Sequence, residues 1–324
     1  MVKLDEWSDF TQSKCVVVLF GRKPVPGKVK TRLAKSIGPE AAADLYRDMA
    51  EIAVTNAMSA TGQVIFSCSE ADEVHDVKRW LKGLPAFHWQ DIAVRAQPQS
   101  VRLEDRLTDA ILSVFEDEGA DSVIVAGTDV PRLSSGVIVN GVLLLRSYDI
   151  VLGPAEDGGY YLIGIQKQCV AGLGRDAAAD FVCKLFKGIH WSTQFVFREQ
   201  VRNAKSLGLT VAPYNKLPCL VDIDTFNDVR VFVQAEAERA QRRKKRTTAM
   251  AGVGERLGSP SRGPGSAALG VGAGEPPSAG TAEGAAERLV EKMQSLVTRE
   301  DGEGKGCEVV GAAKWGKWLK RFVP

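Results

Sequence analysis

Histidine is scarce in this 324-residue chain, and its cysteines lack the spacing of a metal site. There are three His and six Cys residues, and no two cysteines stand in a CxxC pair. A zinc cage or a histidine-based catalytic triad is therefore a poor interpretation, so we expect carboxylates, Lys and Arg to carry the chemistry. Scattered free thiols are typical of a reducing compartment, which predicts a cytoplasmic protein.

The chain also lacks an excess of one charge and any long apolar run. Its 42 basic and 40 acidic residues give a net charge of +2. A dedicated nucleic-acid binder usually carries a strong basic excess, so we expect no nucleic-acid partner. No apolar run approaches the ~20 residues of a membrane-spanning helix, so no transmembrane segment is expected. Asp5, Glu6 and Asp9 near the amino terminus are unlike a secretory signal.

Composition changes sharply near residue 240 and predicts three parts of the chain. Residues 1–13 form a short polar extension, and residues 14–240 alternate β-branched apolar runs with amphipathic segments. That alternation is typical of an α/β domain with a mostly parallel central sheet. Residues 241–324 are low in complexity and rich in Gly, Pro and basic residues, which predicts a largely disordered tail.

Within this tail, a short helix is expected at 283–297. The last residues place Trp315, Trp318 and Phe322 among Lys and Arg side chains. This basic amphipathic pattern could contact an anionic membrane surface or a partner weakly. The alternative is a solvated tail whose Trp residues make no specific contact.

Hydrophobic patterning predicts the elements of the α/β domain. Strands are expected at 15–20, 64–68, 92–96, 122–126, 149–152, 160–165 and 209–212. Helices are expected at 39–58, 74–81, 103–115, 137–145, 193–207 and 225–240. Ligands bind beyond the carboxyl ends of the strands in such sheets, so each loop that follows a strand is a candidate site.

The loop after the first strand, GRKPVPGKVKTR at 21–32, carries five cations and no acid. Because it leaves a buried strand and leads towards a helix, it suits a pyrophosphate group. The GxxxxGK[ST] spacing of a P-loop is absent. A solvated basic loop is the alternative. The residues expected to bind nucleotide phosphates are Gly21, Arg22, Lys23, Gly27, Lys28, Lys30 and Arg32.

Two further loops offer carboxylates for a divalent cation. The loop GTDVP follows the 122–126 strand and places Thr128 and Asp129 at its end. The segment VDIDT contains Asp222 and Asp224. Either Asp224 or Thr225 can cap the following helix, which leaves Asp222 as a possible second metal ligand. Carboxylate oxygens suit a cation held between diphosphate oxygens. Ordinary turn and cap chemistry is the alternative for both loops.

A third loop, GPAEDGGYY at 153–161, combines two acids, glycines and aromatic residues. Glu156 or Asp157 could act as a base or bind sugar hydroxyls, and a Gly-rich hairpin turn is the alternative. The other residues assigned to substrate binding are Gly158, Gly159, Tyr160, Arg106 and Trp191. Trp191 could wall an acceptor site, whereas an exposed helix Arg is the alternative for Arg106.

Four segments in this order, 20–33, 127–131, 152–162 and 222–225, resemble a family of bacterial-type glycosyltransferase-like proteins. Some members are called arsenosugar-biosynthesis glycosyltransferases, and the resemblance runs from about residue 15 to about residue 240. It implies the Rossmann-like GT-A nucleotide-diphospho-sugar transferase fold and a divalent metal, Mn²⁺ or Mg²⁺. It further implies that the basic loop contacts nucleotide phosphates, that Asp129 binds the metal, and that Asp157 lies near the sugar or acceptor.

The chain departs from the family pattern in two places. Residues 101–106 read VRLEDR where a GDLGER-like stretch is usual, and the two-acid DxD reads TDV at 128–130. With a single acid at Asp129, metal binding would need Asp222 or another carboxylate.

Three functions are compatible with these residues. The leading hypothesis is a metal-dependent glycosyltransferase that moves a sugar from a nucleotide-diphosphate sugar to a small acceptor. The runner-up is a nucleotidyltransferase that joins an NTP to a phosphorylated metabolite and releases pyrophosphate, because KTRL at 30–33 and GTDVP also resemble small-metabolite guanylyl- and cytidylyltransferases. The third is a non-catalytic, nucleotide-binding regulatory protein.

Overall fold

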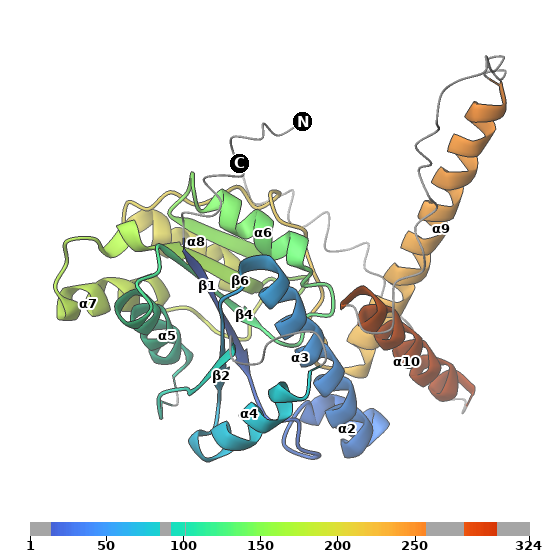
Figure 1. Cartoon of the computed structure of the whole chain (residues 1–324), viewed down its shortest axis with the longest axis horizontal. Helices are drawn as coiled ribbons and strands as arrows, with labels where there is room; N and C mark the ends of the chain where they lie inside the picture. The colour runs from blue at the N-terminus through green and yellow to red at the C-terminus, as the bar shows by residue number, and fades with distance from the viewer. Residues whose placement is uncertain (1–13, 85–91, 101, 257–281, 303–324) are drawn as a thin grey trace, which may run out of the picture. The chain divides into compact units, whose positions relative to one another are not determined.

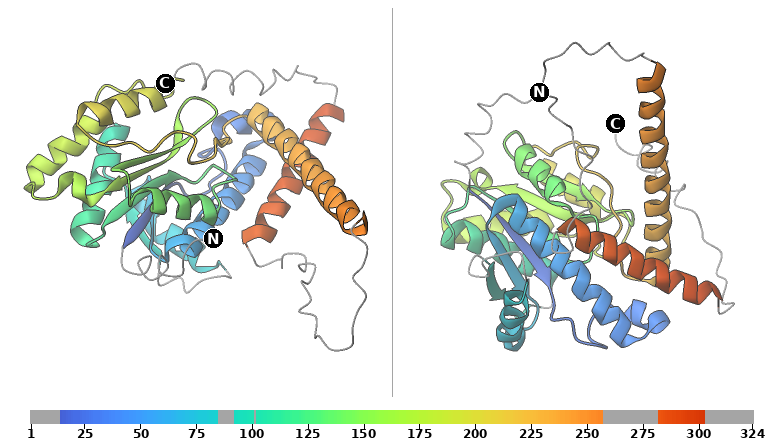
Figure 2. Two further views of the ribbon diagram at one scale, coloured as in Figure 1. Left: turned by 90° about the horizontal axis from the view of Figure 1, so that it is seen from above. Right: turned by 45° about the vertical axis from the view of Figure 1, so that its right-hand side comes forward.

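The structure, a computed structural model, describes residues 14–84, 92–100, 102–256 and 282–302. The chain divides into one unit that ends at Phe226 and a second that begins at Asn227. Every predicted site residue belongs to the first unit, in which helices lie on both faces of a central sheet (Figures 1 and 2).

The sheet of the first unit has six strands in the order β3-β2-β1-β4-β6-β5. Four neighbouring strands pair in parallel, namely β1 (Cys15–Gly21), β2 (Val64–Cys68), β3 (Ile92–Ala96) and β4 (Ser122–Gly127). The strand β6 (Tyr160–Gln166) runs antiparallel to both β4 and β5 (Ile150–Pro154). The predicted α/β fold with a mostly parallel sheet is therefore confirmed.

The central strand β1 shows why these residues form a sheet that is covered on both sides. Its sequence is CVVVLFG, and every residue except Phe20 is buried. Branched apolar side chains fit the pleated surface of a strand that packs against helices on both faces. Val16 and Val18 belong to one apolar core, and Val17 and Leu19 belong to the other.

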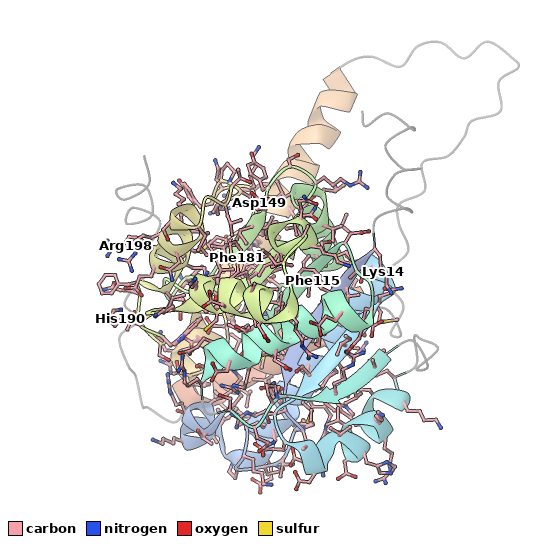
Figure 3. All side chains as sticks on the ribbon, turned by 90° about the vertical axis from the view of Figure 1, so that its left-hand side faces the viewer. Lys14, Phe115, Asp149, Phe181, His190 and Arg198 are labelled. Carbon is pink, nitrogen blue, oxygen red and sulfur yellow. The ribbon has the colours of Figure 1, made fainter. Side chains whose placement is uncertain are left out.

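Helices cover each face of the sheet as a separate layer. One layer contains α3 (Pro39–Thr61), α4 (Val74–Lys82) and α6 (Ser135–Leu144). The other contains α5 (Leu103–Asp117), α7 (Arg175–Phe186) and α8 (Val196–Ser206). Figure 3 views this second layer, in which Phe115 of α5 and Phe181 of α7 belong to one apolar core.

Some elements differ from the sequence prediction. The expected strand at 209–212 is wrong, because only Val211 forms a bridge, with Ile150. The helices α2 (Thr31–Ile37) and α7 were not predicted, nor were the short 3-10 helices η1 (Ala71–Glu73) and η3 (Lys167–Val170). Local signals for these elements are weak because α2 follows a Gly- and Pro-rich loop and α7 follows Gly174.

The second unit contains α9 (Phe226–Arg256) and α10 (Ala282–Gly302). The helix α9 continues past residue 240, and α10 spans the helix expected at 283–297. No helix among the described residues is long and apolar enough to cross a membrane. The aromatic cluster of Trp315, Trp318 and Phe322 lies outside the described residues, so the domain boundary and the role of the tail remain predictions.

Gly21, at the end of β1, provides a test of the packing beneath the site. A Cβ added there would overlap the ring of the fully buried Phe66. Overpacking of this kind costs about 1–3 kcal/mol, so Gly21→Ala should lower the melting temperature by several degrees. Gly136→Ala is the matched control because a helical Cβ there meets open space beyond Ser134. Equal melting temperatures for the two variants in a thermal melt would contradict the packing described.

Candidate active site

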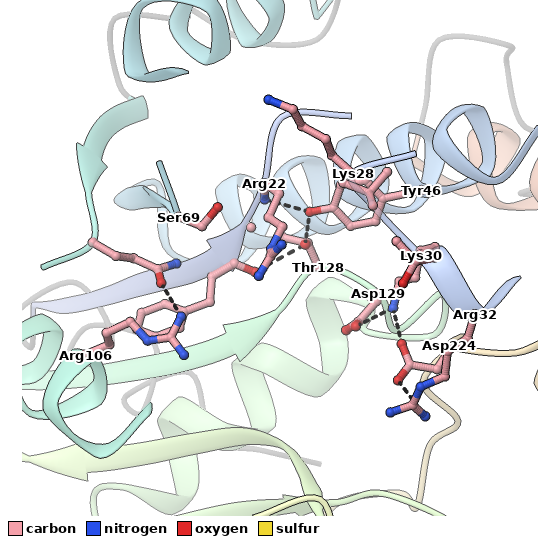
Figure 4. A pocket seen from close by; sticks show the side chains of 15 residues that line it. Arg22, Lys28, Lys30, Arg32, Tyr46, Ser69, Arg106, Thr128, Asp129 and Asp224 are labelled. Atoms are coloured by element: carbon pink, nitrogen blue, oxygen red, sulfur yellow. Dashed lines mark hydrogen bonds and ion pairs between the residues drawn. The ribbon is translucent and has the colours of Figure 1, made fainter. Parts of the chain in front are cut away.

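The carboxyl ends of the four parallel strands converge on one cavity of about 340 Å³. Gly21, Ser69, Gln97 and Thr128 lie at or just after the ends of β1, β2, β3 and β4, and all four line it (Figure 4). Parallel strands present their carboxyl ends at the same edge of a sheet, which is where ligands bind in this class of fold. We call this space the first cavity.

Lys30 forms the most buried ionic contact at this edge. Its Nζ lies 2.7 Å from an oxygen of Asp129 and 2.7 Å from an oxygen of Asp224, and its side chain is 7% exposed (Figure 4). Burial alone would lower the pKa of Lys30, but the two carboxylates outweigh burial and raise it. The lysine is therefore a fixed cation that joins the loops after β1 and β4 to the segment before α9.

The backbone of Lys30 is strained, and the residue forms its two ion pairs in this strained conformation. It adopts a left-handed conformation, with φ 45° and ψ 47°, at the start of α2. Such a conformation costs a residue with a Cβ of the order of 1–2 kcal/mol, and it persists only where surrounding contacts over-determine it. The two carboxylates supply those contacts.

A buried hydroxyl pair fixes the loop that carries Asp129. Tyr46 of α3 lies 3.0 Å from the hydroxyl of Thr128, which also donates to the Phe20 carbonyl at 3.2 Å. The backbone N–H of Arg22 donates to the Tyr46 hydroxyl at 2.8 Å. Burial raises the pKa of Tyr46, so its hydroxyl stays protonated. One side chain therefore holds both the basic loop and the Asp129 loop.

Four cations besides Lys30 line the first cavity: Arg22, Lys28, Arg32 and Arg106. Lys28 and Arg32 are both 69% exposed, and each forms a long, solvent-exposed ion pair, at 3.5 Å with Glu73 and 3.9 Å with Asp224. Arg106 donates to the Gln97 side-chain oxygen at 3.1 Å. Because acids do not saturate these cations, the cavity can attract a polyanion.

A second cavity of about 490 Å³ adjoins the first. Both are lined by Phe20, Arg32, Asp129 and Asp224. The second cavity adds acidic and aromatic side chains, among them Asp157, Asp222, Tyr160 and Trp191. One cavity is therefore rich in cations, the other is rich in carboxylates, and Asp129 and Asp224 lie where the two meet.

The loop that carries Asp157 needs a glycine next to it. Gly158 has φ +91°, and a Cβ there would overlap the backbone of Gln194. Its carbonyl accepts from the Phe197 N–H at 2.9 Å, and the Gly159 N–H donates to the Asp157 carboxylate at 2.8 Å. These contacts fix Asp157 at the wall of the second cavity.

The environment of Asp222 disfavours the ionised form of its carboxyl group. Burial, followed by the charges of Asp157 and Asp129, raises the pKa of Asp222 to about 7. Asp224 behaves in the opposite way: burial would raise its pKa, but Lys30 outweighs burial and lowers it. The N–H of the intervening Ile223 donates to the Asp129 carbonyl at 3.0 Å, which ties the 222–224 segment to the loop after β4.

The structure brings most of the predicted site residues together. The first cavity collects Gly21, Arg22, Lys28, Lys30, Arg32, Arg106, Thr128 and Asp129. The second collects Arg32, Asp129, Asp157, Gly159, Tyr160, Trp191 and Asp222.

Four predicted residues line neither cavity. Lys23 pairs instead with Asp76 at 2.5 Å, and Gly27 occupies a turn with φ 78°. The Glu156 N–H donates to the Leu220 carbonyl at 3.0 Å, and Gly158 acts through backbone packing. A role for any of these four in binding or catalysis remains a prediction.

Sequence reasoning missed three residues that shape the site: Asp224, Tyr46 and Gln97. Asp224 was interpreted as a helix cap, although the DID pattern places it two residues from Asp222. Tyr46 lies within a long amphipathic helix and Gln97 follows a strand, so neither carries a local signal for a site. Only the tertiary structure shows that each touches the first cavity.

The opposite environments of Asp222 and Asp224 predict opposite effects of pH on stability. The pKa of Asp222 is raised above its unfolded value, so its charge increasingly opposes folding as the pH rises from ~4 to ~7. Asp222→Asn should therefore raise the melting temperature at pH 8 and change it little at pH 4.

The pKa of Asp224 is lowered, so its stabilising charge is lost only in acid. Asp224→Asn should therefore lower the melting temperature at pH 8 and have less effect below pH 4. Thermal melts across this range check both, and shifts of the same sign at pH 8 would contradict the environments described.

Comparisons with known proteins agree with this arrangement. Residues 53–193 match the protein family described as "Uncharacterized protein conserved in bacteria (DUF2064)". A protein of solved structure from Desulfovibrio desulfuricans G20 is 30% identical in sequence to this chain. Its nucleotide-diphospho-sugar transferase activity is itself inferred. The match covers 69% of this chain and 87% of that protein, with a TM-score of 0.57.

More distant matches have lower TM-scores, and no function follows from them. A 4-diphosphocytidyl-2C-methyl-D-erythritol synthase from Anaerococcus prevotii is 10% identical, with coverage of 67% and 94% and a TM-score of 0.42. A cytidylyltransferase from Leptospira borgpetersenii is 14% identical, with coverage of 68% and 85% and a TM-score of 0.42. No curated protein matches the sequence. The identity and coverage of the D. desulfuricans match establish that this chain is a transferase of the same family, the GT-A-like nucleotide-sugar transferases that carry the DUF2064 region.

Proposed function

We propose that the protein transfers a glycosyl group from a nucleotide-diphospho-sugar to a small acceptor. The observation that carries this proposal is the junction of two cavities of opposite character at Asp129 and Asp224. A cationic cavity suits the diphosphate of the donor, and a carboxylate-lined cavity suits hydroxyl groups and their protons. The inferred activity of the D. desulfuricans relative supports the same chemistry.

The donor diphosphate would bind at Arg22, Lys28, Arg32 and Arg106, which line the first cavity. Guanidinium groups bind phosphate oxygens in a bidentate manner and stay charged at every physiological pH. These cations would stabilise negative charge as it develops on the departing diphosphate, and electrostatic stabilisation of this kind usually contributes more to catalysis than any other single effect. Lys30 is committed to two carboxylates, so its contribution would be to position Asp129 rather than to bind phosphate.

Asp129 and Asp222 would hold a divalent cation, Mn²⁺ or Mg²⁺. Both line the second cavity, their oxygens are the donors that such ions prefer, and the raised pKa of Asp222 marks a carboxylate that a cation would stabilise. Among the described residues, no three acidic, His or Cys side chains already form a metal cage, so binding would need some rearrangement. When bound, the ion would neutralise charge on the donor diphosphate.

Asp157 would be the base that accepts the acceptor's proton if the reaction inverts the anomeric centre. It is exposed at the cavity wall, and the Gly159 N–H orients its carboxylate. A base must lie within hydrogen-bond reach of the proton that it removes, and Asp157 is the carboxylate of the 153–161 loop that lines the second cavity. We further propose that this chemistry resides in residues 14–240 and that the tail is dispensable for it.

Nucleotidyl transfer is the second candidate function. The cations of the first cavity would suit a nucleoside triphosphate as well as a diphosphate. The products separate the two reactions, because glycosyl transfer releases a nucleoside diphosphate and nucleotidyl transfer releases pyrophosphate.

Calorimetric titration with a panel of nucleotide-diphospho-sugars tests the proposal. At least one donor should bind, and replacing Arg22, Lys28 and Arg32 with Ala should weaken it at least ~10-fold and reduce its salt dependence. Lys23→Ala is the matched control: it removes a cation from the same loop, but one that pairs with Asp76 outside the cavity. Binding that is unchanged in the triple variant, or equally weakened in the control, would contradict the proposed phosphate site.

A further inference from the structure

One wall of the second cavity is a fixed aromatic surface. The Trp191 indole N–H donates to Glu104 of α5 at 3.2 Å. Its ring meets the ring of Tyr160 edge to face, with centroids 6.5 Å apart. The Tyr160 hydroxyl in turn donates to Gln200 of α8 at 3.0 Å. Because each ring is held by a hydrogen bond and by the other ring, the wall is already formed before any ligand binds.

The loop that carries Trp191 is tied down on both sides. The carboxylate of Glu199, a residue that is 8% exposed, accepts from the His190 N–H at 2.8 Å. The Thr193 hydroxyl donates to the His190 carbonyl at 2.7 Å, and Ser192 between them has a left-handed φ of 62°. Figure 3 labels His190 within this loop and Arg198 on α8. These contacts hold the loop, and with it Trp191, in one conformation beside the second cavity.

The charges around the second cavity disfavour an anion. Four carboxylates line it: Asp129, Asp157, Asp222 and Asp224. Lys30 and Arg32 offset two of them, and Arg32 is the one cation among the described lining residues. Asp157 and Asp222 are left without a cationic partner in the cavity. A phosphate group would meet like charge there in the absence of a bound metal ion, which disfavours its binding.

We infer that the second cavity takes an uncharged, hydroxyl-bearing ring compound and rejects its phosphorylated form. Hydroxyl groups would donate to Asp157, and the apolar face of the ring would pack on Trp191 and Tyr160. The inference rests on the proposed function and deepens it, because it assigns the attacking group to an acceptor hydroxyl rather than a phosphate.

The corresponding reaction balances without a further reactant. The acceptor oxygen forms a bond to the anomeric carbon of the donor sugar. The bond from that carbon to the diphosphate oxygen breaks, and its electron pair leaves with the nucleoside diphosphate. The acceptor's hydroxyl proton passes to a carboxylate of the cavity or to water.

Two probes that differ by one phosphate test this inference: methyl glucopyranoside and glucose 1-phosphate. Saturation-transfer NMR measures their dissociation constants for the full chain carrying Arg22→Ala and Lys28→Ala, which removes cations that line only the first cavity, at matched ionic strength in buffer that contains EDTA. We expect the neutral probe to bind at least ~10-fold more tightly than glucose 1-phosphate. Trp191→Ala should abolish its signal, and Phe195→Ala should not, because Phe195 is an exposed aromatic of the same segment that lines neither cavity. Replacing Asp157 and Asp222 with Asn should bring the two constants within about threefold.

Three results would overturn the inference: equal or tighter binding of glucose 1-phosphate, no binding of the neutral probe, or binding of the neutral probe that survives Trp191→Ala. None of these results touches the proposed function itself, because nucleotide-diphospho-sugars are titrated separately and depend on the cations of the first cavity. Failure of nucleotide binding with normal probe binding would instead remove the proposed function and leave a site for neutral ring compounds.

Discussion

The ion pairs of Lys30 hold the active-site edge of this fold together. Asp129 is 99 residues from Lys30 in sequence and Asp224 is 194 residues away, yet both carboxylates lie 2.7 Å from its ammonium group. Removing one carboxylate leaves the buried Lys30 less compensated, although the cost is below the ~3–5 kcal/mol of a fully buried pair because Asp129 is 32% and Asp224 45% exposed. The contact therefore sets the relative positions of the basic loop, the loop after β4 and the 222–224 segment, and with them the walls of both cavities.

That arrangement places cationic and acidic side chains on opposite sides of the boundary between the two cavities. Cations that acids do not saturate lie on the side of β1 to β3, and carboxylates lie on the side of β5 and β6. The antiparallel β6 contributes to this separation, because its first residue, Tyr160, begins at the edge where the parallel strands end. A diphosphate and a hydroxyl-bearing acceptor could then approach the same boundary from opposite sides, which is the geometry that transfer between them requires.

The sequence was informative where local chemistry determines structure. Apolar runs predicted β1, β2, β3 and β4 to within a residue, and the loops after β1 and β4 were identified as parts of the site. Asp224, by contrast, has a local cap signal that hides its contact with Lys30, a contact that only the tertiary fold creates. The sequence did not predict the ion pairs of Lys30 with Asp129 and Asp224 either, because a basic loop on its own predicts only attraction to anions. The 209–212 segment has strand-like residues but forms one bridge, since its neighbours in space decide its pairing.

The central claim is that one site, positioned by Lys30 and Asp129, breaks the bond between a sugar and a nucleoside diphosphate. Phosphorus NMR of a nucleotide-diphospho-sugar incubated with the protein, an acceptor pool and Mn²⁺ tests it most directly. The wild-type chain should release a nucleoside diphosphate. Release should be at least ~100-fold slower with a folded Asp129→Asn variant, and the loss should be smaller with Asp224→Asn, which weakens the same lysine contact but spares the proposed metal ligand. Pyrophosphate formed from a nucleoside triphosphate in place of this product, or equal rates for wild type and Asp129→Asn, would contradict the central claim.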